Sequence, residues 1–299
     1  MATIAGTFKT FDQIGAKLDV EDVIYDISPT DVPFTSAIGT STATQTLHQW
    51  QSYELAAVGT NALLEGADAG AASHDQTEMK TANTQIFGKV VATSGTAEKT
   101  EQYGRSSELA LAISKKGSEL KRDIEHAFIG AGQAGTAGSG SAARQLTSAQ
   151  NQIDASTTNT AGSNRTFTET LLLGVLQSVY VAGGNPNMIQ VTPNHSVTVA
   201  GFAASAGRER DIGTGTQITN AVDLYVSPFG SCAIVASRFL QQNSCLVLDT
   251  EYWSRAVLRP MQTINLARTG DSEKKQLLTE LTLVCEADKA SGKITALTA

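Results

Sequence analysis

Residues 106–129 form the one long segment of the chain with a clear helical period, and this segment most narrows the folds that the chain can adopt. Its apolar side chains recur every three or four residues and share one face: Leu109, Ile113, Leu120, Ile124, Ala127 and Phe128. Ser106 or Ser107 can cap the start of the helix, and Gly130 can end it. At 1.5 Å per residue the helix would be roughly 36 Å long, about the width of a small domain.

Charge is unevenly distributed along the 299 residues. The formal net charge of −7 lies wholly within residues 1–99, and residues 100–299 are neutral overall. An acidic chain without a basic run is a poor candidate for tight binding of nucleic-acid phosphates. The acidic first third is consistent with solubility alone, or with contacts to basic groups of a neighbouring subunit. With 41% hydrophobic and 17% charged residues, we expect a globular chain of one large domain or two interleaved ones.

The three cysteines are predicted to be reduced thiols in the core. Cys232, Cys245 and Cys285 are widely spaced in apolar stretches, and none belongs to a CxxC pair, so a zinc site is not expected. Residues 1–10 lack the basic start and apolar centre of a secretion signal, and no apolar run reaches the roughly 18 residues of a membrane span.

Residues 1–43 are expected to be an extended arm. Pro29 and Pro33 interrupt any continuous helix, although residues 20–27 have the apolar spacing of a short amphipathic turn. Phe34 and Ile38 follow as an apolar anchor. An arm with hydrophobic residues but no core of its own needs another surface to bind.

Residues 44–97 are predicted to form a long two-stranded excursion. The outgoing strand, 45–55, carries Trp50 and Tyr53, and the returning strand is placed at 84–96. The connection between them is rich in Ala, Gly and Asp and is long for a compact domain, which favours a functional loop. Such a hairpin is expected to be stable only when it lies on another surface.

The remaining sequence alternates helices and strands in an α+β order. Residues 131–165 are low in complexity and are expected to be a loop or flexible insertion. Helices are predicted at 168–183 and 193–202. Strands are predicted at 188–191, 221–226, 231–236, 245–249, 261–267, 275–285 and 293–297, of which 261–267 and 275–285 form a terminal hairpin.

Motifs for catalysis or cofactor binding are missing or lie in the wrong context. Residues 130–135 match GxGxxG, but a dinucleotide site needs a strand before the motif and a helix after it, whereas here a helix precedes it. The chain has no P-loop and no GxSxG elbow, and His48, His74 and His195 have no spacing typical of metal ligation. We therefore expect no enzyme activity, no cofactor and no metal. An unrecognised hydrolase, with a triad formed only in space, is an alternative.

Several segments taken together resemble one known family. These segments are Thr10–Gly15, Asp22–Phe34, Leu47–Trp50, Val90–Thr96 and Lys115–Asp123. They resemble the tailed-phage major capsid proteins typified by the major head protein of phage SU10. The likeness is clear over residues 10–130 and continues beyond them in the order of the elements.

The resemblance implies an HK97-like capsid fold. In that fold an N-terminal arm and an extended hairpin, the E-loop, reach over neighbouring subunits, a peripheral P-domain holds a long spine helix, and an axial A-domain faces the centre of the capsomer. The implied bounds are 1–43 for the arm, 44–97 for the E-loop, 98–135 for the P-domain spine helix, 136–255 for the A-domain, and 256–299 for the returning P-domain hairpin and last strand.

The implied function is a shell protein of the virion. It would assemble in the host cytoplasm, as hexamers and pentamers, into the icosahedral head around double-stranded DNA, which it would contact only weakly and non-specifically. Separate scaffolding, portal and decoration proteins are further implied partners, and no membrane partner is expected. We expect Phe34, Ile38, Trp50 and Tyr53 to be anchors on adjacent subunits. An encapsulin-like compartment shell is an alternative with the same fold.

Within this fold the helix at 106–129 would be the spine. Its apolar face is expected to pack on the terminal hairpin around Leu281 and Leu283. Its polar face, with Lys115, Arg122 and Glu125, is expected to face the shell interior or a neighbouring subunit.

Overall fold

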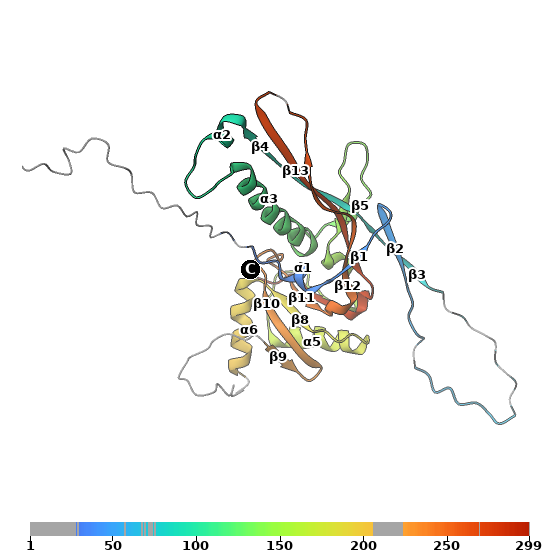
Figure 1. Cartoon of the computed structure of the whole chain (residues 1–299). Coiled ribbons are helices and arrows are strands. Elements are labelled where there is room, and N and C mark those ends of the chain that lie inside the picture. The colour runs from blue at the N-terminus through green and yellow to red at the C-terminus, as the bar shows by residue number, and fades with distance from the viewer. Residues whose placement is uncertain are drawn as a thin grey trace, which may run out of the picture.

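The computed structural model shows an elongated molecule with two packed bodies and a projecting hairpin (Figure 1). It describes residues 28, 30–56, 58–66, 68, 70, 74, 76–205, 224–268 and 270–298. The amphipathic turn expected at 20–27 lies outside these residues. In Figure 1 the long helix lies along a sheet in the upper body, and a second sheet with two further helices forms the lower body.

The described elements have the following bounds. The helices are α1 (Pro33–Ala37), α2 (Gly95–Lys99), α3 (Glu108–Glu125), α4 (Ala149–Gln152), α5 (Glu169–Val181) and α6 (Pro193–Ser205), with a π-helical turn, His126–Gly130, after α3 and short 3-10 turns at Ala155–Thr157, Thr250–Tyr252 and Asp288–Ala290. The strands are β1 (Gly39–Thr42), β2 (Leu47–Ser52), β3 (Glu78–Asn83), β4 (Gln85–Ser94), β5 (Ala134–Thr136), β6 (Gln145–Thr147), β7 (Thr158–Asn159), β8 (Met188–Val191), β9 (Leu224–Ser227), β10 (Gly230–Ala236), β11 (Cys245–Leu248), β12 (Trp253–Asn265), β13 (Ser272–Cys285) and β14 (Gly292–Ile294).

The upper body is a four-stranded sheet in the order β1–β12–β13–β4, with α3 packed beside it. β1 runs parallel to β12, and the other neighbours are antiparallel. Alternation along β4 buries Phe87 and Val91 and exposes Ile86, Gly88 and Val90 on the opposite face. Leu281 and Leu283 of β13 belong to the same core as Ile124 of α3, so the expected packing of the long helix on the terminal hairpin is confirmed. The hairpin itself starts earlier than expected, because β12 already begins at Trp253.

Local contacts set the two ends of α3. Ser107 caps the first turn and also donates a hydrogen bond to Glu98 of α2. At the other end the π-helical turn directs Phe128 into the core. The turn ends at Gly130, where a Cβ atom would lie 2.1 Å from the carbonyl oxygen of Phe239. Glycine is therefore required here by close approach of the backbone.

The lower body is a six-stranded sheet in the order β7–β14–β11–β8–β10–β9. Its core holds the buried side chains of α5 and of the central strands, among them Leu172, Val175, Leu176, Val179, Ile189, Val191, Val247 and Ile294. The bounds of β8 agree with the sequence-based prediction, and α5 and α6 lie where helices were expected. Each of these elements has a strong local pattern, which is why the sequence located them.

The returning strand of the projecting hairpin differs from the prediction. β2 pairs with β3, from Leu47 opposite Asn83 to Ser52 opposite Glu78. The segment expected to return, 84–96, instead forms β4 and runs along β13. The prediction was wrong because alternation indicates that one face of a strand is buried but does not identify the neighbouring strand.

Residues 131–165 are also more ordered than expected from their composition. They form the β5–β6 hairpin, α4 and β7, and they bury Leu146 in the upper core. Small polar side chains hold the segment in place. Ser148 Oγ donates to the carbonyl of Ala127 at 2.7 Å, and Gln150 Nε2 donates to the carbonyl of Ile129 at 2.7 Å. A low-complexity composition therefore concealed a packed segment whose contacts are largely polar.

Candidate functional site

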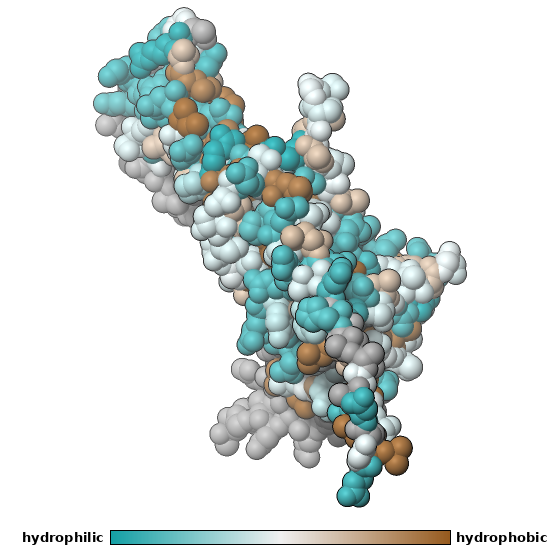
Figure 2. All heavy atoms as spheres, turned by 90° about the vertical axis from the view of Figure 1, so that its right-hand side faces the viewer, coloured by the Kyte–Doolittle hydropathy of each residue, from teal (hydrophilic) through white to brown (hydrophobic). Residues whose placement is uncertain are grey.

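The segment beyond β2 exposes large apolar side chains. Leu55, Val58, Leu63 and Leu64 have exposed fractions of 86, 105, 86 and 83%. In Figure 1 this loop reaches away from both bodies, and Figure 2 shows hydrophobic side chains on the narrow projection at the bottom of the view. Exposed apolar side chains gathered at a projecting end are typical of interaction surfaces.

Trp50 and Tyr53, the two hairpin residues predicted to be anchors, have different environments. Trp50 packs on its own chain, against Ala43, Ala256 and Val284. Its indole Nε1 is buried and has no hydrogen-bond partner among the described residues. Tyr53 follows the end of β2 and is 54% exposed. Tyr53 is therefore available to another surface, whereas Trp50 attaches the base of the hairpin to the upper sheet.

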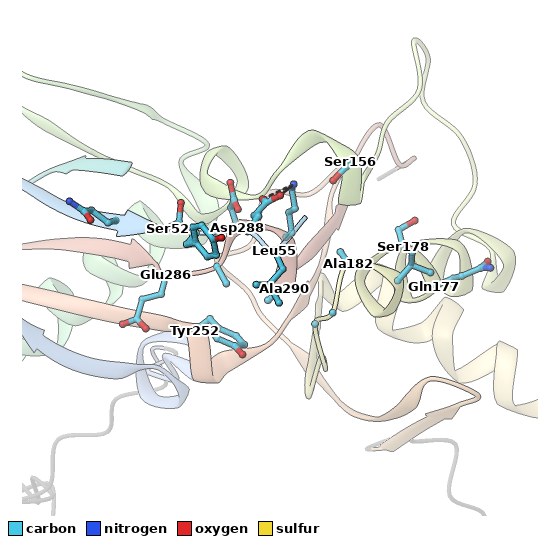
Figure 3. Close-up of a pocket in the computed structure, with 18 residues that line it drawn as sticks. Ser52, Leu55, Ser156, Gln177, Ser178, Ala182, Tyr252, Glu286, Asp288 and Ala290 are labelled. Carbon is cyan, nitrogen blue, oxygen red and sulfur yellow. Dashed lines mark hydrogen bonds and ion pairs between the residues drawn. The ribbon is translucent and has the colours of Figure 1, made fainter. Parts of the chain in front are cut away.

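A cleft of about 1140 Å³ lies between the hairpin base and the lower body (Figure 3). Its walls are residues 51–55, the end of α5 and residues 286–290. Figure 3 shows Glu286 and Tyr252 on one side of the cleft and Gln177 of α5 on the other. The described lining contains carboxylates, a lysine and several hydroxyl groups but neither histidine nor cysteine.

Three ion pairs lie at the hairpin base beside this cleft, and two of them join it to residues 288–289. Lys80 Nζ lies 2.9 Å from Asp288 and 2.9 Å from Glu78, and Lys289 Nζ lies 2.6 Å from Glu54. Burial disfavours the charge of Lys80, but the hydrogen bonds and charges of Glu78 and Asp288 outweigh it and raise the pKa of Lys80 above the usual lysine range. The hairpin thus leaves the body from a fixed position.

Glu280, a buried carboxylate that the sequence did not single out, fixes the other side of the hairpin base. Glu280 of β13 forms ion pairs with Arg144 and, at 2.8 Å, with Arg259. It also accepts a hydrogen bond from Thr84 Oγ1 at 2.9 Å, between β3 and β4. These residues are distant in sequence and form no local motif, so no sequence pattern could have found them.

The arm is anchored in the core of its own chain. The Phe34 side chain is fully buried, with its ring edge-on to Phe128 at 6.1 Å and to Trp253 at 5.8 Å between centroids. Ile38 is also buried in this core. The pairing of β1 with β12 brings the arm onto its own sheet, so Phe34 and Ile38 pack within the chain. Their contacts with an adjacent subunit stay a prediction.

Glu125 holds the start of α1. Its Oε1 accepts a hydrogen bond from Phe34 N at 2.9 Å, and its Oε2 accepts from Thr35 N at 2.8 Å and from Thr35 Oγ1 at 2.5 Å. The N-cap residue Val32 supplies no side-chain cap, so the carboxylate from the spine takes that role. The sequence placed Glu125 on the polar face with Lys115, which is exposed, but Glu125 is fully buried. A helical wheel did not identify it because its partners come from another segment.

The arm attachment should weaken as the pH rises. Burial raises the pKa of Glu125 above the ordinary carboxyl value, against the effect of the hydrogen bonds from Thr35 and Phe34. Because the folded pKa lies above the unfolded one, this contribution to stability is complete below the unfolded pKa and is lost as the pH rises through the folded pKa. In the wild-type chain, protection of the Phe34 and Thr35 amides from hydrogen exchange, corrected for intrinsic rates, should fall as the pH rises from the unfolded to the folded pKa of Glu125. In Glu125→Gln it should stay level.

A second carboxylate of the same helix provides the control for this measurement. Glu119 accepts hydrogen bonds from Lys116, which lower its pKa, and its described partners are Lys116 and Lys89 rather than α1. Glu119→Gln should therefore leave the pH profile of arm protection unchanged. Protection that rises with pH in the wild-type chain would mean that the charged carboxylate is the better cap, contrary to the expectation.

The part of the chain that the structure describes contains no group of histidine, cysteine, aspartate and glutamate residues that could hold a metal ion. None of its helices is long and apolar enough to cross a membrane.

The three cysteines are buried and free, as expected. Burial raises the pKa of Cys232 to about 11 and that of Cys245 to about 12, which keeps both thiols protonated and unreactive.

Comparison with known proteins gives consistent matches over nearly the whole chain. The family model of the SU10 major capsid protein matches residues 3–298. The major capsid protein of Escherichia phage Phieco32 is 30% identical over 336 aligned positions, which cover 95% of each chain. Among solved structures, the capsid of a native GTA particle has a TM-score of 0.68 at 10% identity, covering 97% of this chain and 98% of that one. The capsid of cyanophage A-1(L) has a TM-score of 0.67 at 11% identity, covering 97% and 99%.

The fold and these matches define a phage major capsid protein with an HK97-like fold. The chain belongs to the SU10 major capsid protein family and is part of the virion capsid. The expected fold and function are thereby confirmed. An encapsulin from Synechococcus elongatus PCC 7942 has a TM-score of 0.59 at 9% identity over 92% of each chain, a likeness that extends to the fold alone.

Proposed function

We propose that copies of this chain form the hexamers and pentamers of an icosahedral head around phage DNA, through contacts rather than catalysis. In this assembly α3 is the spine helix, the β2–β3 hairpin is the E-loop, and the E-loop end, residues 53–66, covers a neighbouring copy. The observation that carries the proposal is the exposure of Leu55, Val58, Leu63 and Leu64 on a loop that is fixed at its base and has little packing of its own. Burying one leucine contributes about 1.5–3 kcal/mol, so a neighbouring surface gains much from covering them.

Tyr53 and the charge of the loop extend this surface. Tyr53 is exposed at the start of the loop, where it lines the cleft beside the hairpin base. Residues 53–77 carry acidic side chains and neither lysine nor arginine. A neighbouring surface with cationic residues around an apolar centre would fit both features, and its contacts should weaken as salt is added.

Electron microscopy of the purified full-length chain tests the proposal. We expect closed shells, or isolated five-fold and six-fold capsomers, with density for residues 53–66 lying on an adjacent subunit. A discrete small oligomer in which this loop contacts no other copy would contradict it. Repeating the preparation at low and high salt checks the charge contribution, and assembly indifferent to ionic strength would count against that part.

A further inference from the structure

A groove between the arm, the spine helix and the upper sheet remains open in the described part of the molecule. Its volume is about 620 Å³. Clefts of roughly 300–1,000 Å³ typically enclose a drug-sized ligand, so this one can hold a few side chains but not a domain. The lining is largely apolar and includes Val32, Ile38, Ile124, Val257, Met261 and Leu281.

The charges that line this groove are both positive. Lys121 of α3 and Arg255 of β12 are the charged residues of its described lining. Neither forms an ion pair with a described residue, and Arg255 Nε donates only to Thr40 Oγ1, at 2.9 Å. Glu125 lies nearby, but its oxygens accept from the α1 backbone and from Thr35. The groove therefore suits a short segment with one apolar face and acidic side chains beside it.

We propose that residues 20–27 of the same chain occupy this arm–spine groove. Four of the eight residues are aliphatic and recur at helical spacing: Val20, Val23, Ile24 and Ile27. The charged side chains of this stretch are all acidic: Glu21, Asp22 and Asp26. The apolar face of the segment thus fits the apolar lining of the groove, and its negative charge is opposite to the positive charge of the groove.

The position of the segment in the chain favours docking within one subunit. Residues 28–31 alone separate it from Val32, which already lines the groove. Four residues span at most about 14 Å, so the segment cannot move far from the groove. A tether of this length gives an effective concentration on the order of millimolar, against which a second copy must compete.

The competing occupant is the E-loop end of a second copy. Leu63 and Leu64 with Glu65 also combine apolar and acidic side chains, and they are exposed. Because the E-loop projects away from its own upper body, it could reach this groove only on an adjacent subunit (Figure 1). A test must therefore identify both the segment that occupies the groove and the chain that supplies it.

Carbodiimide crosslinking at Lys121 makes both distinctions. An equal mixture of unlabelled and ¹⁵N-labelled full-length protein is treated, and the amide-linked peptides are identified by mass spectrometry. Links from Lys121 to Glu21, Asp22 or Asp26 should form within one chain. They should be roughly tenfold more frequent than links from Lys115 to the same acids, because Lys121 lines the groove and Lys115 does not. Links from Lys121 to Glu65 or Asp68, links between differently labelled chains, or no excess over Lys115 would each overturn the proposal.

Two substitutions on opposite faces of the segment provide the matched control. Ile24→Asp places a charge on the apolar face and should reduce the Lys121 links to the level of Lys115. Tyr25→Asp adds the same charge outside that face and should leave the links unchanged. Equal losses in the two variants, or no loss in Ile24→Asp, would overturn the proposal. The crosslinks can be read on unassembled protein, so their absence would be distinct from a failure of shell assembly.

Discussion

Replacing both Leu63 and Leu64 with serine should abolish shells while leaving the subunit folded. These side chains are exposed in the single chain, so their removal costs the subunit little. In an assembled head each buried leucine would contribute about 1.5–3 kcal/mol, and the contact repeats at every subunit. Association should therefore weaken by at least about tenfold per leucine. Electron microscopy and light scattering measure the shells, and circular dichroism measures the fold.

Thr60→Ser is the matched control for this experiment. It changes an exposed residue of the same loop without removing a large apolar surface, and it should assemble like the wild-type chain. A double serine variant that yields shells at the wild-type concentration would show that the E-loop end does not carry the subunit contact, and the proposed function would then need another surface.

Phe34→Ala should lower the free energy of unfolding of the isolated subunit by about 3–5 kcal/mol, the usual range for truncating a buried phenylalanine. Phe34 is fully buried between Phe128 and Trp253, and the cavity left by its ring would lie in the core that joins arm, spine and sheet. Urea unfolding of unassembled protein measures the loss, and limited proteolysis should detect a loosened arm.

Phe34→Leu separates packing from other effects, because it keeps most of the volume and should cost less than about 1.5 kcal/mol. The two variants also test whether Phe34 packs within its own subunit or on an adjacent one. If Phe34→Ala changed the unfolding free energy of isolated subunits by less than about 1 kcal/mol but blocked assembly, Phe34 would act on an adjacent subunit, as the sequence first indicated.

The elements that the sequence predicted well are those with a strong local period. The spine helix, α5 and β8 were located because apolar residues recur at the spacing that each backbone geometry imposes. The family was identified from several short segments in a fixed order, which are informative together although each is weak alone. The three buried thiols followed from their apolar surroundings and wide spacing.

The contacts that define the site could not be predicted from local sequence patterns. Strand β4 has the alternation of any half-buried strand, and only the fold assigns it to β13 rather than to the E-loop. Glu280 forms ion pairs with Arg144 and Arg259, which lie in segments that share no local pattern with it. The low-complexity residues 131–165 pack through polar groups such as Ser148 and Gln150, which composition cannot distinguish from loop residues.

The amino-acid sequence by itself determined the spine helix, the order of the elements and the family, because these depend on spacing along the chain. The tertiary structure decided what each element contacts. It turned Glu125 inward onto α1 and placed Phe34 in the core of its own subunit. It also left Leu55, Leu63 and Leu64 exposed on the loop beyond β2. The physical reason is that a periodic pattern specifies which face is apolar, whereas the partner of that face is selected by packing among segments far apart in the chain.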